Sequence, residues 1–147
     1  MSYLVDTNIL LRLVQKNNPM NPDAQRAIVT LKQKCELLYI IPQNLIEFWA
    51  VATRPINSNG LGLTIIQAAE ETEKLKKIFT LQTDTPEIFI EWESLVIKHQ
   101  VMGKQVHDAR LVAAMVTHKI THLLTFNIDD FKRFSEIVVV DARSFAP

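Results

Sequence analysis

The sequence predicts a three-layer α/β/α domain with a central, mostly parallel sheet of about five strands. Short continuous apolar runs occur at 3–5, 37–41, 78–81, 122–126 and 137–140. Runs of this length and composition are typical of strands buried on both faces of a parallel sheet. Longer segments with the apolar spacing of helices separate these runs, and this alternation of helix and strand is characteristic of α/β folds.

The expected helices lie between the expected strands. Their segments are 8–15, 22–34, 42–53, 64–75, 85–99 and 105–118, with a short turn at 129–134. Asn21 is expected to cap the second helix because Pro22 suits the first helical position, and Pro42 opens the third in the same way. The polar stretch 54–63, which holds Gly60 and Gly62, is expected to be a mobile surface loop.

Composition limits the class of protein. The chain has 147 residues, 48% of them hydrophobic, which suits one compact domain over 1–147 and excludes a disordered chain. Cys35 is the only cysteine, so an internal disulfide is excluded and a reducing compartment is expected. Neither a secretory signal nor a membrane-spanning run is evident, and we expect a cytoplasmic protein without membrane contact.

Net charge gives no support to a nucleic-acid partner. Lys plus Arg and Asp plus Glu number 16 each, so the formal net charge is zero. Proteins that bind nucleic acids are usually basic, and binding by this chain would need a local basic patch.

Asp6 directly follows the first apolar run. Ligands of open parallel sheets bind beyond the carboxyl ends of the strands, where Asp6 would lie. The competing interpretation is an ordinary helix N-cap, a position where aspartate is favoured. Asp6 alone does not decide between the two.

Glu47 lies in an otherwise apolar helical segment. Gln43, Glu47 and Arg54 form one narrow polar stripe on it. The stripe either faces water or lines a cleft, and a buried glutamate would need a partner cation.

Asp108 shares a helical face with Leu111, Val112 and Met115, which is the expected core face. An isolated carboxylate is costly there. The helix N-terminus offsets only about 0.3–1 kcal/mol, which is too little without a metal ion or hydrogen bonds. A functional role is therefore favoured for Asp108.

A further polar group follows the fourth apolar run. It comprises Thr125, Asn127, Asp129 and Asp130. Turn chemistry alone can explain such residues. Taken with the other three acids, however, they would meet at one edge of a parallel sheet, where carboxylates repel one another unless a cation is present. Mg²⁺ and Mn²⁺ prefer oxygen ligands, so a site for metal-assisted phosphodiester cleavage is predicted.

The chain resembles the PIN-domain family, and within it the VapC-type toxins of toxin–antitoxin systems. The resemblance spans nearly the whole chain in order. Its segments are Val5-Asp6-Thr7-Asn8, Glu47, His107-Asp108-Ala109-Arg110-Leu111, Leu124-Thr125-Phe126-Asn127 and Asp130-Phe131, with Arg54-Pro55 and 59–63 as a loop found in some of these toxins.

The resemblance implies a metal-dependent endoribonuclease that cleaves single-stranded RNA, with tRNA as a candidate target and Mg²⁺ or Mn²⁺ as cofactor. Asp6, Glu47 and Asp108 match the three strongest acids of the family, and Thr7 matches a supporting hydroxyl. Many relatives have Asp where this chain has Asn127. Asp130 is therefore the expected fourth acid, with Asp129 behind it. A small antitoxin partner and a homodimer are also implied.

Three basic residues are candidates for RNA contact: Arg54, Arg110 and Lys104. Solvated surface is the competing interpretation, above all for Lys104. His107 precedes Asp108 but points about 100° away from it on the helix, which disfavours a general-base role.

Other functions remain open. The principal alternative is a catalytically weak RNA-binding or protein-binding module of the same fold, which Asn127 favours. A phosphotransfer domain is disfavoured because no lysine lies near the last strand, and a DNA nuclease of another fold is a third possibility.

Overall fold

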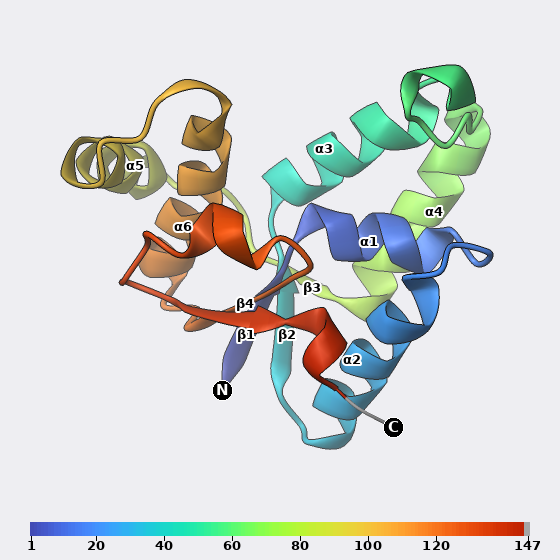
Figure 1. Ribbon diagram of the computed structural model, residues 1–147, viewed down its shortest axis with the longest axis horizontal. Helices are drawn as coiled ribbons and strands as arrows, with labels where there is room; N and C mark the ends of the chain where they lie inside the picture. The colour runs from blue at the N-terminus through green and yellow to red at the C-terminus, as the bar shows by residue number, and fades with distance from the viewer. Residues whose placement is uncertain (146–147) are drawn as a thin grey trace.

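The structure, a computed structural model, describes residues 1 to 145, and the last two residues of the expected domain lie outside this range. Helices and strands alternate along the chain (Figure 1). They are β1 (Ser2–Val5), α1 (Thr7–Val14), α2 (Asn21–Gln33), β2 (Leu37–Ile40), α3 (Pro42–Thr53), α4 (Ile65–Ile78), β3 (Thr80–Leu81), α5 (Pro86–Lys98), α6 (Val106–His118), β4 (His122–Thr125) and β5 (Val138–Asp141). Short 3-10 turns follow α3, precede α6 and follow β4 and β5: η1 (Ile56–Ser58), η2 (Gly103–Gln105), η3 (Ile128–Phe131) and η4 (Ala142–Ser144).

The sheet has the order β3-β2-β1-β4-β5, and each neighbouring pair is parallel. The predicted five-stranded parallel sheet is therefore confirmed. From β1 the chain moves outward through β2 and β3, then returns to the opposite side of β1 for β4 and β5. The order reverses between β1 and β4, and such a switch point leaves a crevice beyond the strand ends.

Two apolar cores cover the two faces of the sheet, because side chains alternate along each strand. Tyr3 and Val5 face the core formed with α1 to α4, whereas Leu4 faces the core formed with α5 and α6. On β4, Leu124 and Leu123 divide in the same way. Figure 1 shows α1 to α4 on one side of the sheet and α5 with α6 on the other, which confirms the three layers.

Helix starts follow the expected chemistry with one exception. Thr64 and Gln67 form a reciprocal capping box at the start of α4. Asn21 was expected to cap α2, but this prediction is wrong: Met20 occupies the cap position and Asn21 is already helical. Its buried amide instead donates to the backbone oxygens of Arg12 and Leu13, and so ties α2 to the end of α1.

Segment 54–63 is exposed at the surface, as predicted, but its backbone is fastened rather than loose. Backbone hydrogen bonds at 2.9 Å run from Gly60 N to Pro55 O, from Gly62 N to Arg54 O and from Leu63 N to Ala52 O. The turn η1 lies within this segment. Pro, Asn and Gly residues occur both in mobile loops and in compact hydrogen-bonded turns. The sequence alone therefore could not distinguish a mobile loop from the turn that is observed.

Strand boundaries differ most at the edges of the sheet. β3 has only two residues, because Ile78 still belongs to α4. β5 begins at Val138 rather than Ile137 and ends at Asp141. In residues 1–145, none of the helices has the length and hydropathy needed to cross a membrane.

Candidate active site

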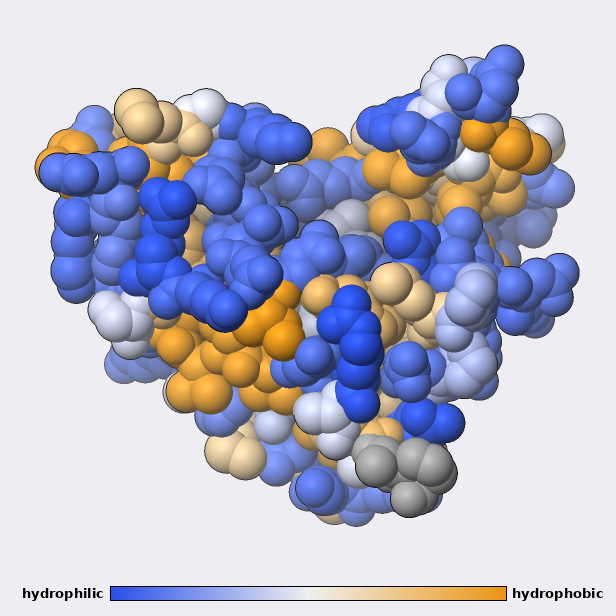
Figure 2. Space-filling view, viewed as in Figure 1, coloured by the Kyte–Doolittle hydropathy of each residue, from blue (hydrophilic) through white to orange (hydrophobic). Residues whose placement is uncertain are grey.

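The crevice beyond β1 and β4 collects the acidic residues of the sequence motifs. Asp6 follows β1, and its backbone N–H donates to Leu124 O of β4 at 3.0 Å. One hollow of about 350 Å³ is lined by the carboxylates of four separate segments, namely Asp6, Glu47, Asp108 and Asp130. The molecular surface is notched between the α3–α4 side and the α5–α6 side, and β1 runs toward this notch (Figures 1 and 2).

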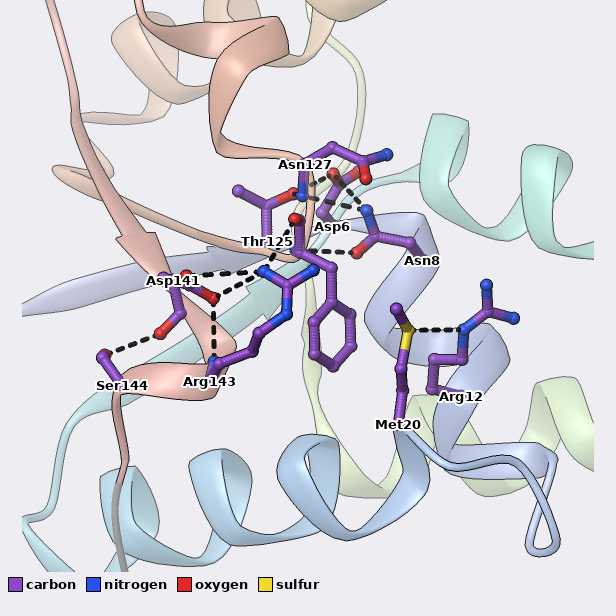
Figure 3. A network of polar contacts seen from close by, with 10 residues as sticks. Asp6, Asn8, Arg12, Met20, Thr125, Asn127, Asp141, Arg143 and Ser144 are labelled. Atoms are coloured by element: carbon purple, nitrogen blue, oxygen red, sulfur yellow. Dashed lines mark hydrogen bonds and ion pairs between the residues drawn. The ribbon is translucent and has the colours of Figure 1, made fainter.

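Asp6 is buried at the start of α1, with 7% of its surface exposed. Its Oδ1 accepts from Thr7 N at 2.7 Å, so it is an N-cap, and its Oδ2 accepts from Thr125 Oγ1 at 2.7 Å and from Asn8 Nδ2 at 3.3 Å. Figure 3 shows Asn8 and Thr125 converging on this carboxylate. Both interpretations of Asp6 therefore apply: it caps α1 and it lines the cleft.

Burial raises the pKa of Asp6 to about 7, although the hydrogen bonds from Thr125 and Thr7 oppose this rise. The negative charges of Glu47 and Asp108 raise it further. Asp6 therefore lies close enough to two other carboxylates to be affected by their charge.

Glu47 extends from the middle of α3 and is half-buried. Its Oε1 accepts from the Thr7 hydroxyl at 2.8 Å, and its Oε2 accepts from Gln43 Nε2 at 3.2 Å. Asn44 Nδ2 in turn donates to the Thr7 hydroxyl at 3.3 Å. Gln43 is only 8% exposed, and Glu47, to which it donates, lines the hollow, so this part of the polar stripe of α3 does not simply face water.

Asp108 and Asp130 line the same hollow. Burial raises the pKa of Asp108 to about 6, with further contributions from the charges of Asp130 and Glu47. In the described part of the chain, neither carboxylate has a hydrogen-bond or ion-pair partner. A half-buried Asp108 without such a partner is an electrostatic cost that a bound cation would relieve.

The donor set fits a hard divalent cation, but not a closed cage of protein ligands. Among residues 1–145, no group of three or more His, Cys, Asp or Glu side chains is close enough to hold one ion as it stands. Mg²⁺ commonly keeps several waters and uses one or two carboxylates directly. One or two of these carboxylates, with water between the ion and the others, would suit such an ion.

Of the remaining predicted site residues, Asn127 and Arg54 line the hollow with the acids, whereas Asp129, Lys104 and Arg110 do not. Asp129 is exposed and pairs with Lys132, which makes Asp130 the better fourth acid. Lys104 is exposed and lowers the pKa of Asp108 through its charge. Arg110 is already bonded to Gln43 and Asp84.

Several residues that support the acids are not among the predicted site residues. Asn8, Gln43, Asn44 and Thr125 all bind to them or to Thr7. The signals were present for two of them, because Gln43 precedes Glu47 by one helical turn and Thr125 ends a strand beside Asp6.

A family model described as the PIN domain matches residues 3–137. The chain belongs to the PIN-domain family. The PIN-domain match includes all four acids of the hollow, as well as the strands on both sides of the switch point. A comparison with curated protein sequences finds no match.

The PIN domain of this chain is similar in fold to solved structures of low sequence identity. VapBC2 from Rickettsia felis, bound to a DNA fragment from its promoter, matches with a TM-score of 0.73, 15% identity and coverage of 96% of this chain and 98% of that chain. VapBC-1 from nontypeable Haemophilus influenzae matches with a TM-score of 0.71 and 18% identity, covering 97% and 98%. VapC20 from Mycobacterium tuberculosis, a sarcin-ricin loop cleaving toxin, matches with a TM-score of 0.60 and 15% identity, and the match covers 82% of this chain and 86% of that chain.

Proposed function

We propose that this PIN domain is a divalent-metal-dependent endoribonuclease that acts on single-stranded RNA and is the toxin of a toxin–antitoxin pair. The observation that carries the proposal is the hollow lined by Asp6, Glu47, Asp108 and Asp130. Burial, followed by the charges of neighbouring acids, raises the pKa of Asp6 and Asp108, as expected for carboxylates arranged to receive a cation.

Each acid has a proposed role in this site. Asp6, Glu47 and Asp108 would hold Mg²⁺ or Mn²⁺ directly or through water, and Asp130 with Asn127 would orient the attacking water. Such an ion lowers the pKa of bound water and offsets negative charge on the scissile phosphate. Thr7 and Thr125 hold Glu47 and Asp6 by hydrogen bonds of 2.8 and 2.7 Å.

The direct test is RNA cleavage by Asp6→Asn and Asp108→Asn in Mg²⁺ and in Mn²⁺. Both variants should lose at least about a hundredfold in rate, in line with losses of several kcal/mol at metal-assisted sites. Asp23→Asn, which changes an acid on α2 outside the hollow, is the matched control. Full activity of both site variants would overturn the proposal, and a single-stranded DNA substrate tests the preference for RNA.

A second candidate function is a PIN-fold binding module without strong catalysis. Asn127 at the fourth position and the lack of a preformed three-ligand group in residues 1–145 favour it. Calorimetric titration with Mn²⁺, followed by the cleavage assay, separates the two. Metal binding without RNA cleavage would support the module.

We also propose a small antitoxin partner, a homodimer and a cytoplasmic location for this chain. The solved structures of similar fold named VapBC, and one named as a toxin-antitoxin complex from Klebsiella pneumoniae, support the antitoxin. Light scattering on the purified chain tests the dimer. Co-expression with the protein of a neighbouring short reading frame tests the antitoxin, which should suppress RNA cleavage.

A further inference from the structure

We propose that Gln43 positions Glu47 in the candidate active site, and that Arg110 acts through Gln43 instead of contacting RNA. The inference rests on the proposed nuclease function but concerns two residues outside its four acids. Its basis is an unbroken chain of polar contacts that runs from Asp84 through Arg110 and Gln43 to Glu47.

Gln43 uses both ends of its amide. Its Nε2 donates to Glu47 Oε2 at 3.2 Å and to the backbone oxygen of His107 at 2.8 Å, and its Oε1 accepts from Arg110 Nη1 at 3.1 Å. The side chain is buried, with 8% exposed. A buried amide with all these contacts has one favourable place and direction, because unmade hydrogen bonds are costly.

Arg110 fixes the direction of this amide. A guanidinium group only donates, so it requires the oxygen of Gln43 to face it. A flipped amide would turn its NH₂ group toward Arg110 and its oxygen toward the Glu47 carboxylate, and both contacts would be repulsive. The second arm of Arg110 reaches Asp84 Oδ1 at 3.4 Å, which anchors the guanidinium from behind.

The contact with His107 O connects two acids. Glu47 belongs to α3, whereas His107 immediately precedes Asp108 in the first turn of α6. Gln43 thus holds Glu47 against the backbone that carries Asp108. Since the Thr7 hydroxyl holds the other oxygen of Glu47, both oxygens of this carboxylate are restrained.

The same contacts argue against RNA binding by Arg110. Its guanidinium already donates to Gln43 and is paired with the acidic Asp84. A phosphate would have to compete with both. Arg54 lines the acidic hollow, is exposed and has no such commitment within residues 1–145, so it is the better candidate for an RNA contact.

The test compares Gln43→Met, Arg110→Met and the double variant, with Gln25→Met on the exposed side of α2 as control. Binding of Mn²⁺ is measured by calorimetric titration, without RNA. Gln43→Met should require about tenfold more Mn²⁺ for half-maximal binding, the lower end of the loss seen when an outer hydrogen-bond partner of a metal site is removed. Arg110→Met should act in the same direction, and the double variant should be no worse than Gln43→Met.

RNA binding in EDTA distinguishes positioning from contact. Arg110→Met should leave the salt dependence of RNA binding unchanged, whereas loss of a phosphate contact would lower the slope by about one unit. A lowered slope, additive effects in the double variant or an unchanged Mn²⁺ midpoint for Gln43→Met would each overturn the proposal. If Gln43→Met does not fold, the partly exposed Arg110→Met carries the same test.

The outcome is separable from that of the proposed nuclease. A wild-type chain that responds to Mn²⁺ but cleaves no RNA would refute the nuclease, while the Mn²⁺ midpoints still decide the role of Gln43. Cleavage by the wild type together with an unchanged Mn²⁺ midpoint for Gln43→Met would refute only the positioning role.

Discussion

The hydroxyl of Thr125 donates a buried hydrogen bond of 2.7 Å to Oδ2 of Asp6, although the two residues are 119 positions apart. They meet because β1 and β4 are parallel neighbours whose carboxyl ends lie together. The bond favours the ionised form of Asp6 against the burial that raises its pKa. The last residue of β4 therefore helps set the charge of the first acid of the site.

Thr125→Val should destabilise the metal-free protein by about 1–3 kcal/mol, because it leaves a buried carboxylate oxygen short of a partner while keeping the side-chain shape. Thr125→Ser keeps the hydroxyl and is the matched control. Urea unfolding at pH 8 measures the difference. Stability of Thr125→Val equal to that of the wild type would show that the bond contributes nothing to Asp6.

Stability of the metal-free protein should rise as pH falls from 8 to 5. Burial, followed by neighbouring charges, raises the pKa of Asp6 to about 7 and that of Asp108 to about 6. In this range the folded state binds more protons than the unfolded state, so the free energy of unfolding decreases as pH rises. Melting temperature in EDTA from pH 5 to pH 8 measures the slope, and Asp108→Asn should flatten it.

Glu136 does not disturb that test. Burial opposes the shift, but the hydrogen bonds from Lys98 and His99 lower the pKa of Glu136 to about 2. Its stabilising effect is present above its unfolded value and is lost only as pH falls toward about 2. A slope between pH 5 and pH 8 that persisted in a variant lacking both raised carboxylates would contradict our assignment to Asp6 and Asp108.

Asp108→Asn should raise the melting temperature in EDTA, because it removes one of the mutually repelling charges in the hollow. A gain of about 1 kcal/mol corresponds to about 2–4 °C in a chain of this size. The same variant should lose most of the rise that Mn²⁺ gives the wild type, since a ligand stabilises only the state that binds it. Glu93→Gln, which neutralises an exposed acid of α5 with no ion pair within residues 1–145, should change neither value.

Gly60→Ala should destabilise the fastened turn after α3. A Cβ at Gly60 would lie 1.9 Å from the backbone oxygen of Arg54, so the backbone has to move. Overpacking of this kind costs about 1–3 kcal/mol. In Gly103→Ala the new Cβ meets open space, and only the positive φ of 66° is unfavourable. That control should lose only the cost of a left-handed alanine, about 1–2 kcal/mol. An equal loss in both variants would argue against a close approach at Gly60.

The sequence predicted the central strands well because β1 and β4 are buried on both faces, which leaves continuous apolar runs. The edge strands β3 and β5 are more exposed, and their predicted bounds were less accurate. The prediction that Asn21 caps α2 was wrong. It was made because asparagine is favoured at the N-cap and because proline, which lacks an N–H, is favoured at the first helical position. The observed hydrogen bonds to Arg12 and Leu13 depend instead on how α1 turns into α2. Local propensity does not contain this information.

The site was predictable only in part, for a similar reason. Asp6 and Asp108 each follow or begin an element, and their position in the chain indicates the edge where they meet. The choice between Asp129 and Asp130 depends on the direction of one 3-10 turn, which neighbouring sequence does not determine. Gln43 meets His107 O across 64 positions, through the packing of α3 beside α6.

The central position of β1 affects the order in which the parts of the site become available during synthesis. Asp6 is synthesised before its neighbour β4, which begins at His122. A nascent chain that ends before β4 has Asp6, Glu47 and Asp108 but lacks the strand that completes the crevice and the Asp130 turn beyond it. On the proposed function, the site would therefore be complete only after β4 and the turn that carries Asp130 have been synthesised.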